Sequence, residues 1–400
     1  MRDGMMSGLN RKDRQLIGAV GFMEVVRMLG IFLILPVLEV YSASLTRSVI
    51  LIALAFGAYG LASAIFQSFF GILSDRIGRK ATIIIGLIPF IAGNLLTFAD
   101  HTILMLIAGR FIAGAGAIGS VATAMVQENV PEQKRNAAMA LVGIPVGIAF
   151  LIGLLLGPEL GYAIGFYYLF LISAVLGVAA VAIVIPLKVS QNMVVHRPSA
   201  IYGINRVSAS LAVAGFSVSF FMILFFYYFQ VFATGILLQN NYMLPIFIPG
   251  VIGGGIAVMI AGRFEGKRTT VMAVASIAVI LVSVPILFLA PLQKSSLLII
   301  EIGSVVFFLG YSLYEIVFPT AITRFASKYH YGSNLGIFNT LQHVGQFAGG
   351  TASGIILGLQ LNRGSQISAL VIMLVLMGVA MVLSAMVYIG SRTGRITAQA

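Results

Sequence analysis

Long apolar stretches separated by short polar segments recur along the whole chain. Each is at least about 20 residues long, the length that an α-helix needs to cross a hydrocarbon core of roughly 30 Å. The stretches are too long for membrane strands and lack the alternation of apolar and polar residues that such strands show. Helices are then the structure that satisfies the backbone in lipid. The pattern predicts twelve spanning helices, over residues 16–40, 48–73, 81–99, 103–127, 137–159, 163–186, 207–233, 241–262, 269–290, 296–322, 335–359 and 366–390.

The composition fits a chain that is solvated by lipid. Of the 400 residues, 60% are hydrophobic and 9% are charged, which leaves too little polar surface for a soluble globule. The absence of cysteine excludes disulfides and thiolate metal sites. A polar start is followed by an apolar run too long for a signal peptide, so we expect the first helix to be retained. The sequence predicts an all-α, multi-pass protein of the cytoplasmic membrane.

The net charge of +12 could indicate a nucleic acid partner or the topology of a membrane protein. The distribution of the basic residues along the chain distinguishes the two. Of the 24 basic residues, 19 fall in segments on one side of the predicted membrane. Arg47, Lys294 and Arg363 lie in the opposite loops, and Arg27 and Arg110 lie inside helices. Cytoplasmic loops carry such an excess of basic residues. We therefore expect both termini in the cytoplasm and no nucleic acid partner.

The spans divide into two related halves. A shift of 191 residues places the start of the first helix on that of the seventh, and Gly71 on Gly262. Parallel repeats of this kind hold a substrate site between them near the membrane midplane. The predicted organisation is two pseudo-symmetric six-helix bundles, residues 1–190 and 207–390, with a cytoplasmic linker over 191–206 and a short tail over 391–400.

The most specific motif is the segment GILSDRIGRK, residues 71–80, in the inner loop after the second span. Gly71 is expected to let two helices approach closely, and Gly78 to permit a tight turn. Asp75 suits the N-terminus of another helix, where the helix dipole favours negative charge. An inner loop that only fixed topology would not need this pattern, so we interpret it as functional.

This segment resembles the signature loop G-x-L-x-D-R-x-G-R-K of the major facilitator superfamily. Two further segments resemble motifs of its twelve-helix drug:proton antiporters. Residues 29–37 match the helix 1 motif, with Glu39 in place of its final proline. Residues 110–116 match the helix 4 motif, with Ala113 in place of glutamine. The loop positions that match are Gly71, Asp75, Arg76, Gly78, Arg79 and Lys80.

A segment of the fifth span resembles the antiporter motif of the same transporters. Ile144 and Tyr162 stand in place of its first and last glycines, and the positions that match are Gly153, Gly157, Pro158 and Gly161.

Nearly the whole chain resembles one branch of the superfamily, the YajR-type drug exporters. The resemblance rests on residues 27–30, 35–37 and 59–61, the 71–80 loop, Glu315 and Gln342. That branch can carry a small cytoplasmic domain after its last helix, whereas only residues 391–400 follow here. Regulation through such a domain is therefore not expected.

The resemblance implies a gating role for the loop. Asp75 would cap the cytoplasmic N-terminus of helix 11 in the outward-facing state, and Arg79 would pair with Glu128 at the inner end of helix 4. Both contacts would break as the halves rock. The helix 5 segment 153–161 would pack across the halves and restrict leak, although from its residues alone an ordinary small-residue packing seam with a proline kink is the alternative.

Ionisable residues inside the spans are costly in lipid and mark functional sites by default. Glu24 and Arg27 share a face of the first span, so they could form either a static ion pair or a proton-coupling pair. Glu315 has no basic residue within a helical turn, which favours a functional role. A carboxylate in a membrane cavity can exchange a proton as a cationic substrate or an arginine approaches. The candidates for proton coupling and the cavity are Glu24, Arg27, Arg110, Glu301, Glu315 and His343.

Aromatic residues crowd the seventh span. They could form a cavity wall for lipophilic or cationic cargo, or they could be lipid-facing bulk with interfacial tyrosines, which is the interpretation we favour. These residues are Phe220, Phe221, Phe225, Phe226, Tyr227, Tyr228, Phe229 and Phe232.

No segment resembles a nucleotide loop, a zinc-ligand pair or a nucleophile and its base, so we expect neither an enzyme nor an ATP-driven pump. No cofactor or metal is expected, and a proton gradient would supply the energy. The sequence predicts a monomeric, proton-coupled secondary exporter of a small lipophilic or cationic compound, which works by alternating access in the lipid bilayer. A proton-coupled metabolite or sugar symporter and a non-transporting membrane sensor on the same scaffold are the alternatives.

Overall fold

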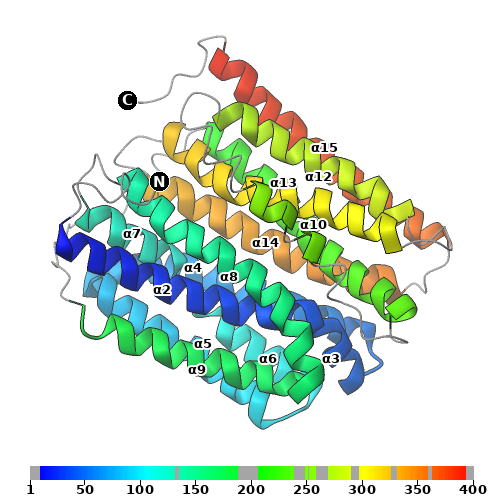
Figure 1. Ribbon diagram of the computed structural model, residues 1–400, viewed down its shortest axis with the longest axis horizontal. Coiled ribbons are helices and arrows are strands. Elements are labelled where there is room, and N and C mark those ends of the chain that lie inside the picture. Colours follow the sequence, from blue (N-terminus) through cyan, green and yellow to red (C-terminus); the bar gives the residue numbers. More distant parts are fainter. Residues whose placement is uncertain are drawn as a thin grey trace. The chain divides into compact units, whose positions relative to one another are not determined.

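The computed structural model describes residues 10–130, 135–187, 206–237, 248–250, 252–257, 269–289, 297–325, 331–358 and 363–392. Every element within these ranges is helical (Figure 1), which confirms the predicted all-α class. Eight helices of the described residues are long and apolar enough to cross a membrane, and each falls on a predicted span. Three further long helices and the helical residues 248–250 and 252–257 occupy the other four predicted spans.

By their internal contacts the residues form two units. Unit 1 comprises Met1–Val37 and Ala62–Pro198, and unit 2 comprises Leu38–Leu61 and Ser199–Ala400. Residues 38–61, which come first in chain order, therefore group by contact with the second unit. The predicted linker lies outside the described residues except for Arg206, which begins a helix, and the predicted tail does so beyond residue 392.

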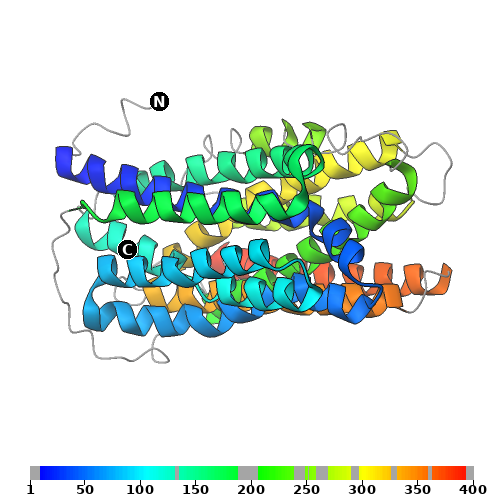
Figure 2. The same ribbon diagram turned by 90° about the horizontal axis from the view of Figure 1, so that it is seen from below.

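The helices from the N-terminus to the end of the sixth predicted span are α2 to α9. In unit 1, α2 packs against α8 and α9, and α5 packs against α6 and α9, as the blue and green helices of Figures 1 and 2 show. The bounds are α2 Arg11–Ile34, the 3-10 turn η1 Leu35–Val37, α3 Leu38–Leu45, α4 Val49–Ile77, α5 Arg79–Ala99, α6 Ile103–Gly114, α7 Gly119–Asn129, α8 Arg135–Ile164 and α9 Phe166–Val184.

The core of unit 1 is built from apolar residues that recur at helical spacing. One cluster contains fully buried side chains from three helices: Met23 of α2, Ile83 and Leu87 of α5, and Met125 of α7, together with Ile118, the residue just before α7. Because a buried methylene contributes about 0.8 kcal/mol, such side chains fix which faces of these helices meet. The faces left over are apolar as well, which suits contact with lipid.

Two of the predicted spans are interrupted. The first contains a 3-10 turn at Leu35–Val37, where Pro36 cannot donate the helical hydrogen bond. The fourth, predicted as one helix over residues 103–127, ends at Gly114 and begins again at Gly119. The predicted span is confirmed, since residues 103–126 are long and apolar enough to cross a membrane. Hydropathy did not predict the break, because the residues of the break are apolar as well. A Cβ at Gly116 would lie 2.6 Å from the Gly86 carbonyl oxygen, so the break packs directly on the backbone of α5.

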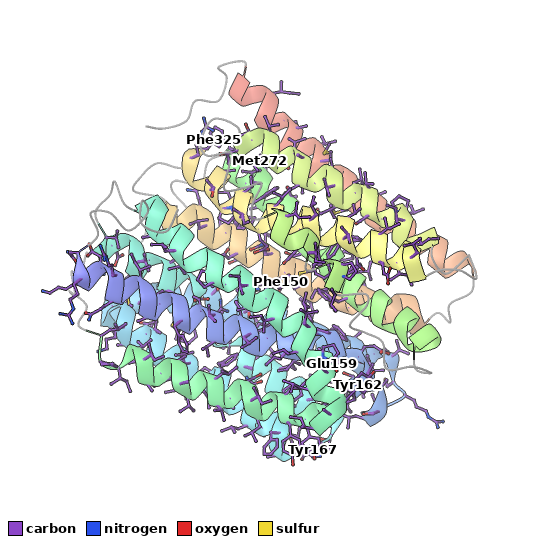
Figure 3. The ribbon with its side chains drawn as sticks, viewed as in Figure 1. Phe150, Glu159, Tyr162, Tyr167, Met272 and Phe325 are labelled. Atoms are coloured by element: carbon purple, nitrogen blue, oxygen red, sulfur yellow. The ribbon has the colours of Figure 1, made fainter. Side chains whose placement is uncertain are left out.

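An aromatic cluster covers one end of unit 1. Tyr162 lies there near Glu159, and Tyr167 lies further out at the same end (Figure 3). The ring of Tyr167 lies 4.4 Å from that of Tyr168 and 4.4 Å from that of His101, between centroids. Amphipathic rings of this kind gather at the level of lipid headgroups, so the cluster fits a membrane interface.

Unit 2 contains the helices of the second predicted half. In it α10 packs against α14 and α15, and α12 packs against α13 and α15. The bounds are α10 Arg206–Leu237, α12 Thr269–Leu289, α13 Leu297–Phe325, α14 Tyr331–Gly358 and α15 Arg363–Arg392.

The aromatic residues of α10 are core residues of unit 2. Phe225 stacks on Phe307 of α13 with 4.0 Å between ring centroids, and Phe221 meets the same ring edge to face at 5.6 Å. All of Phe220, Phe221, Phe225 and Phe226 are buried. The favoured lipid-facing interpretation is therefore wrong for these four, because the facing helix α13 carries its own aromatic residues and the two sets pack together. The side chains of Tyr227, Tyr228, Phe229 and Phe232 lie outside the described residues.

Glycine allows α14 to pack closely on two neighbours within unit 2. A Cβ at Gly345 would lie 2.3 Å from the Phe216 carbonyl oxygen of α10. On the other side, a Cβ at Gly60 of α4 would lie 2.9 Å from the His343 carbonyl oxygen. Such backbone approach is the usual device for joining helices in lipid, where the hydrophobic effect does not hold them together.

Candidate functional site

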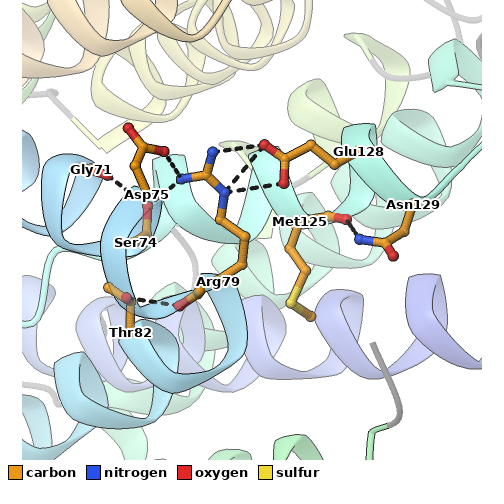
Figure 4. A network of polar contacts seen from close by, with 9 residues as sticks. Gly71, Ser74, Asp75, Arg79, Thr82, Met125, Glu128 and Asn129 are labelled. Atoms are coloured by element: carbon orange, nitrogen blue, oxygen red, sulfur yellow. Dashed lines mark hydrogen bonds and ion pairs between the residues drawn. The ribbon is translucent and has the colours of Figure 1, made fainter. Parts of the chain in front are cut away.

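The loop between α4 and α5 holds a charged network built around Arg79 (Figure 4). Its Nη2 donates to Glu128 Oε1 at 2.7 Å, and its Nε lies 3.2 Å from both oxygens of that carboxylate. Its Nη1 pairs with Asp75 Oδ1 at 2.6 Å and donates to Ser74 Oγ. One planar guanidinium thus joins the end of α4, the start of α5 and the end of α7. The expected pair of Arg79 with Glu128 is confirmed.

The two glycines of the loop differ in their roles. Gly78 has a φ of 91°, in the left-handed region that favours glycine, so the predicted tight turn is confirmed. A Cβ at Gly71 would meet nothing within 4 Å among the described residues, so the expected close helix approach at this position stays a prediction. The Gly71 carbonyl instead accepts a hydrogen bond from Ser74 Oγ at 2.7 Å.

The network is partly exposed to solvent. The side chains of Arg79, Asp75 and Glu128 are 21%, 41% and 34% exposed. Exposed ion pairs contribute only about 0.2–1 kcal/mol, so these contacts can break and form again at little cost. Arg76 is exposed in the last turn of α4, where the helix dipole favours a cation. The expected contact of Asp75 with the start of α14 would join the two units and stays a prediction.

Lys80 has a separate partner that the sequence did not indicate. Its Nζ donates to the carbonyl oxygens of Ile185 at 2.5 Å and Leu187 at 2.9 Å, just after the end of α9. The last carbonyls of a helix have no partner within it, and a cation there also complements the dipole. The final residue of the motif therefore caps the helix that leads into the predicted linker.

Glu24 and Arg27 form the expected ion pair inside α2. Arg27 donates from Nη2 and Nε to Glu24 Oε2, at 2.6 Å and 3.1 Å. Both residues are less than 9% exposed. The other carboxylate oxygen, Oε1, is buried and has no hydrogen-bond partner among the described residues. The pairing is confirmed, whereas the choice between a static pair and a proton-coupling pair stays open.

Arg110 and Glu301, which occupy equivalent positions of the two halves, lie in different surroundings. Arg110 is 5% exposed on α6, one turn before that helix ends at Gly114. Glu301 is half-buried in the second turn of α13. The equivalence in sequence therefore does not extend to burial.

Glu315 lies in a polar group between α13 and α14. Gln342 Nε2 donates to the Tyr314 hydroxyl at 2.7 Å and lies 3.4 Å from Glu315 Oε1. Tyr314 is fully buried, whereas Glu315 has an exposed side chain. No basic side chain pairs with Glu315 among the described residues, as its sequence neighbours predicted. An accessible carboxylate held near an amide and a phenol can bind a proton or a cation.

His343, the neighbour of Gln342, makes a contact on its own helix. Its Nδ1 lies 3.1 Å from Gln346 Oε1, one turn further along α14. The side chain is half-buried. The proposed part of His343 in proton coupling stays a prediction.

The helix 5 segment forms a packing seam within unit 1. A Cβ at Gly157 would lie 2.2 Å from the Leu33 carbonyl oxygen of α2, and one at Gly153 would lie 2.8 Å from Phe32 Cβ. Gly161 faces Phe166 of α9. The resemblance implied that this segment packs across the halves. That expectation is wrong for these glycines, because a Cβ at each would point at a helix of the same unit.

Two polar residues of these sites were missed in the sequence. Tyr314 connects Gln342 to the α13 core, and Ser173 Oγ of α9 lies 3.0 Å from the Gly30 carbonyl oxygen of α2. Single hydroxyls in apolar spans are common, so neither position carries a signal in one sequence. Only the register of the facing helices gives them partners.

Apolar helices with buried and accessible ionisable groups, and with a charged loop that joins three of them, are typical of a polytopic membrane transporter. The model of the Major Facilitator Superfamily matches residues 20–350. The chain therefore belongs to the Major Facilitator Superfamily.

Relatives and solved structures agree with this assignment. The chain is 30% identical over 390 residues to the inner membrane transport protein YajR of Escherichia coli (strain K12), covering 95% of this chain and 85% of that one. It is 32% identical over 145 residues to the class H tetracycline resistance protein of Pasteurella multocida, covering 34% and 35%. The crystal structure of the human organic anion transporter MFSD10 matches with a TM-score of 0.69 at 16% identity, covering 94% and 100%, and so shares the fold.

Proposed function

We propose that this transporter is a proton-coupled exporter of small lipophilic or cationic compounds, which works by alternating access. The accessible carboxylate of Glu315, in a predicted span that contains one other charged residue, Glu301, is the observation that carries the proposal. A charge kept inside a membrane span costs several kcal/mol and persists where it has a task. Similarity of part of the chain to a tetracycline resistance protein supports export as the direction.

The mechanism follows from the competition of two cations for one carboxylate. Protonation from outside makes Glu315 neutral, and a cationic substrate from inside replaces the proton by electrostatic attraction. Because Glu315 lies next to Gln342, either form keeps a hydrogen-bond partner. Proton entry is then linked to substrate exit.

The charged loop acts as the gate in this proposal. The contacts of Arg79 with Asp75 and Glu128 each contribute little, so rocking of the two halves could break them in one state and restore them in the other. We propose that both termini are cytoplasmic, that the protein is a monomer in the bilayer, and that a proton gradient replaces any cofactor as the energy source.

Purified protein in liposomes tests the exchange. With an acidic lumen, ethidium added outside should accumulate inside as protons leave. Glu315→Gln should abolish this accumulation but leave ethidium counterflow without a gradient largely intact. Asp100→Asn, at a half-buried carboxylate in the connection between α5 and α6, is the control and should behave as the parent protein. Ethidium movement in the direction of the protons would instead support the symporter, and unchanged coupling in Glu315→Gln would remove this residue from the proton path.

A further inference from the structure

The side of α2 that its neighbours leave uncovered carries one stripe of exposed residues. Within unit 1, α2 lies between α8 and α9, and α7 packs against it as well (Figures 1 and 2). Arg11, Gln15, Gly18 and Phe22 are exposed and follow one another at intervals of four, three and four residues. This spacing places them on one face of the helix. The stripe is therefore a continuous surface that begins at the first turn of α2.

This stripe passes from a charged end to an apolar one. Arg11 and Lys12 have exposed cationic side chains in the first turn, whereas Phe22 is apolar and 44% exposed. The predicted span begins directly after Gln15. At a rise of about 1.5 Å per residue, Gly18 lies about 10 Å and Phe22 about 16 Å along the helix from Arg11. Because a headgroup layer is roughly 5–8 Å thick, the stripe begins among headgroups and continues beside the hydrocarbon.

The acidic residue of the first turn does not offset the positive charge at this surface. Asp13 is 7% exposed, and its carboxylate accepts a hydrogen bond from the Asn10 backbone N–H at 3.2 Å. The Asn10 side chain in turn accepts from the Asp13 N–H at 2.8 Å, so a capping box already serves the helix start. No ion pair among the described residues includes Arg11 or Lys12. The positive surface thus consists of exposed side chains, not of helix amides.

Gly18 leaves a gap in the stripe between the charged end and the apolar end. A Cβ at this position would meet nothing within 4 Å among the described residues. Leu16 and Ile17, beside it in sequence, are buried in the core of unit 1, so the backbone of α2 is held in place behind the gap. Glycine disfavours a helix relative to alanine, and no described side chain packs against this one. The gap leaves room for an apolar chain that lies along the helix toward Phe22.

We propose that the exposed face of α2 binds one anionic phospholipid. Arg11, Lys12 and Gln15 hold the phosphate, and one acyl chain follows the helix past Gly18 and Phe22. A guanidinium matches two phosphate oxygens at once, and basic residues at the cytoplasmic end of a span attract anionic lipids. The same two cations repel the ammonium group of a zwitterionic lipid. This lipid site goes beyond the proposed transport function and does not depend on the compound that is carried.

Native mass spectrometry of the whole chain in detergent, with no gradient, tests the site with three probes. Dioleoyl phosphatidylglycerol and dioleoyl phosphatidylcholine share their acyl chains and differ in charge, and soluble glycerol 3-phosphate has the anionic group without the chains. Each basic residue beside an anionic headgroup adds about fivefold to the affinity. Phosphatidylglycerol should therefore bind in a saturable step, roughly tenfold or more tightly than phosphatidylcholine, and glycerol 3-phosphate should not displace it.

Four variants locate the lipid. Arg11→Gln should weaken phosphatidylglycerol binding about fivefold. The matched control Arg47→Gln also removes an exposed arginine, between α3 and α4, and should leave the affinity unchanged. Gln15→Glu adds a negative charge to the stripe, where the helix dipole tolerates it, and should bring the affinity near that for phosphatidylcholine. Gly18→Leu fills the gap and should weaken both lipids roughly threefold, since the acyl chain loses contact with the helix.

The outcomes distinguish a lipid site from diffuse attraction and from a phosphate site. Equal affinity for the two lipids, or equal losses in Arg11→Gln and Arg47→Gln, would overturn the site. Displacement of the lipid by glycerol 3-phosphate would replace it with a site for free phosphate esters. Unchanged affinity in Gly18→Leu would overturn the acyl contact. Preference for phosphatidylglycerol that Arg11→Gln weakens and Arg47→Gln does not would support the site, and Gln15→Glu gives the same answer if Arg11→Gln does not fold.

Discussion

Replacing Gly157 by alanine should separate α8 from α2 and destabilise unit 1. The added Cβ would lie 2.2 Å from the Leu33 carbonyl oxygen and 2.9 Å from the Leu33 carbonyl carbon. Ordinary contact begins near 3.4 Å, so the two backbones would have to move apart by about 1 Å, which loses dispersion contacts along the seam. Overpacking of this kind costs about 1–3 kcal/mol, and a backbone atom cannot turn aside as a side chain would.

A matched control isolates that cost. Gly18→Ala adds the same methyl group to a helix at a site where nothing lies within 4 Å. Both variants gain the helix preference of alanine over glycine, about 1 kcal/mol, so this term cancels between them. Unfolding in mixed micelles with increasing dodecyl sulfate, followed by circular dichroism, should place Gly157→Ala about 1–3 kcal/mol below Gly18→Ala. Equal stability of the two variants would refute the backbone contact.

Three further predictions concern polar contacts. Exchanging Arg79 and Glu128 in one double variant should recover part of the transport that either single charge reversal removes, which flux in liposomes measures. The unfolding free energy, measured in micelles, should change by no more than about 1 kcal/mol. Lys80→Met should speed hydrogen exchange in the last turn of α9 and leave α7 unaffected, which mass spectrometry of peptides can follow. Tyr314→Phe leaves Gln342 without its closest partner and should lower the unfolding free energy by about 1–3 kcal/mol in the same micelle titration.

Much of the motif loop could be predicted because its contacts are local or are implied by the resemblance of the motif. Gly78 requires a left-handed φ, and Asp75 and Arg79 stand four residues apart, so the turn and one ion pair follow from the order of residues alone. The resemblance to the superfamily added Glu128, which is distant in sequence. The partner of Lys80 could not be inferred, since it consists of backbone carbonyls that any sequence offers.

The chain by itself determined the class of the protein: hydropathy places its helices in lipid, because a backbone there must satisfy its own hydrogen bonds. The positions of charged residues in the loops predicted the orientation of the chain, and those of ionisable residues in the spans predicted the candidate sites. Both could be inferred from sequence because a charge inside a membrane span costs free energy. Only the tertiary structure decided which helix faces meet. It turned the phenylalanines of α10 inward against α13, directed Gly157 to α2 within its own unit, and split the fourth span next to Arg27. These outcomes depend on backbone approach and on the register between helices, and no property of a single residue records either.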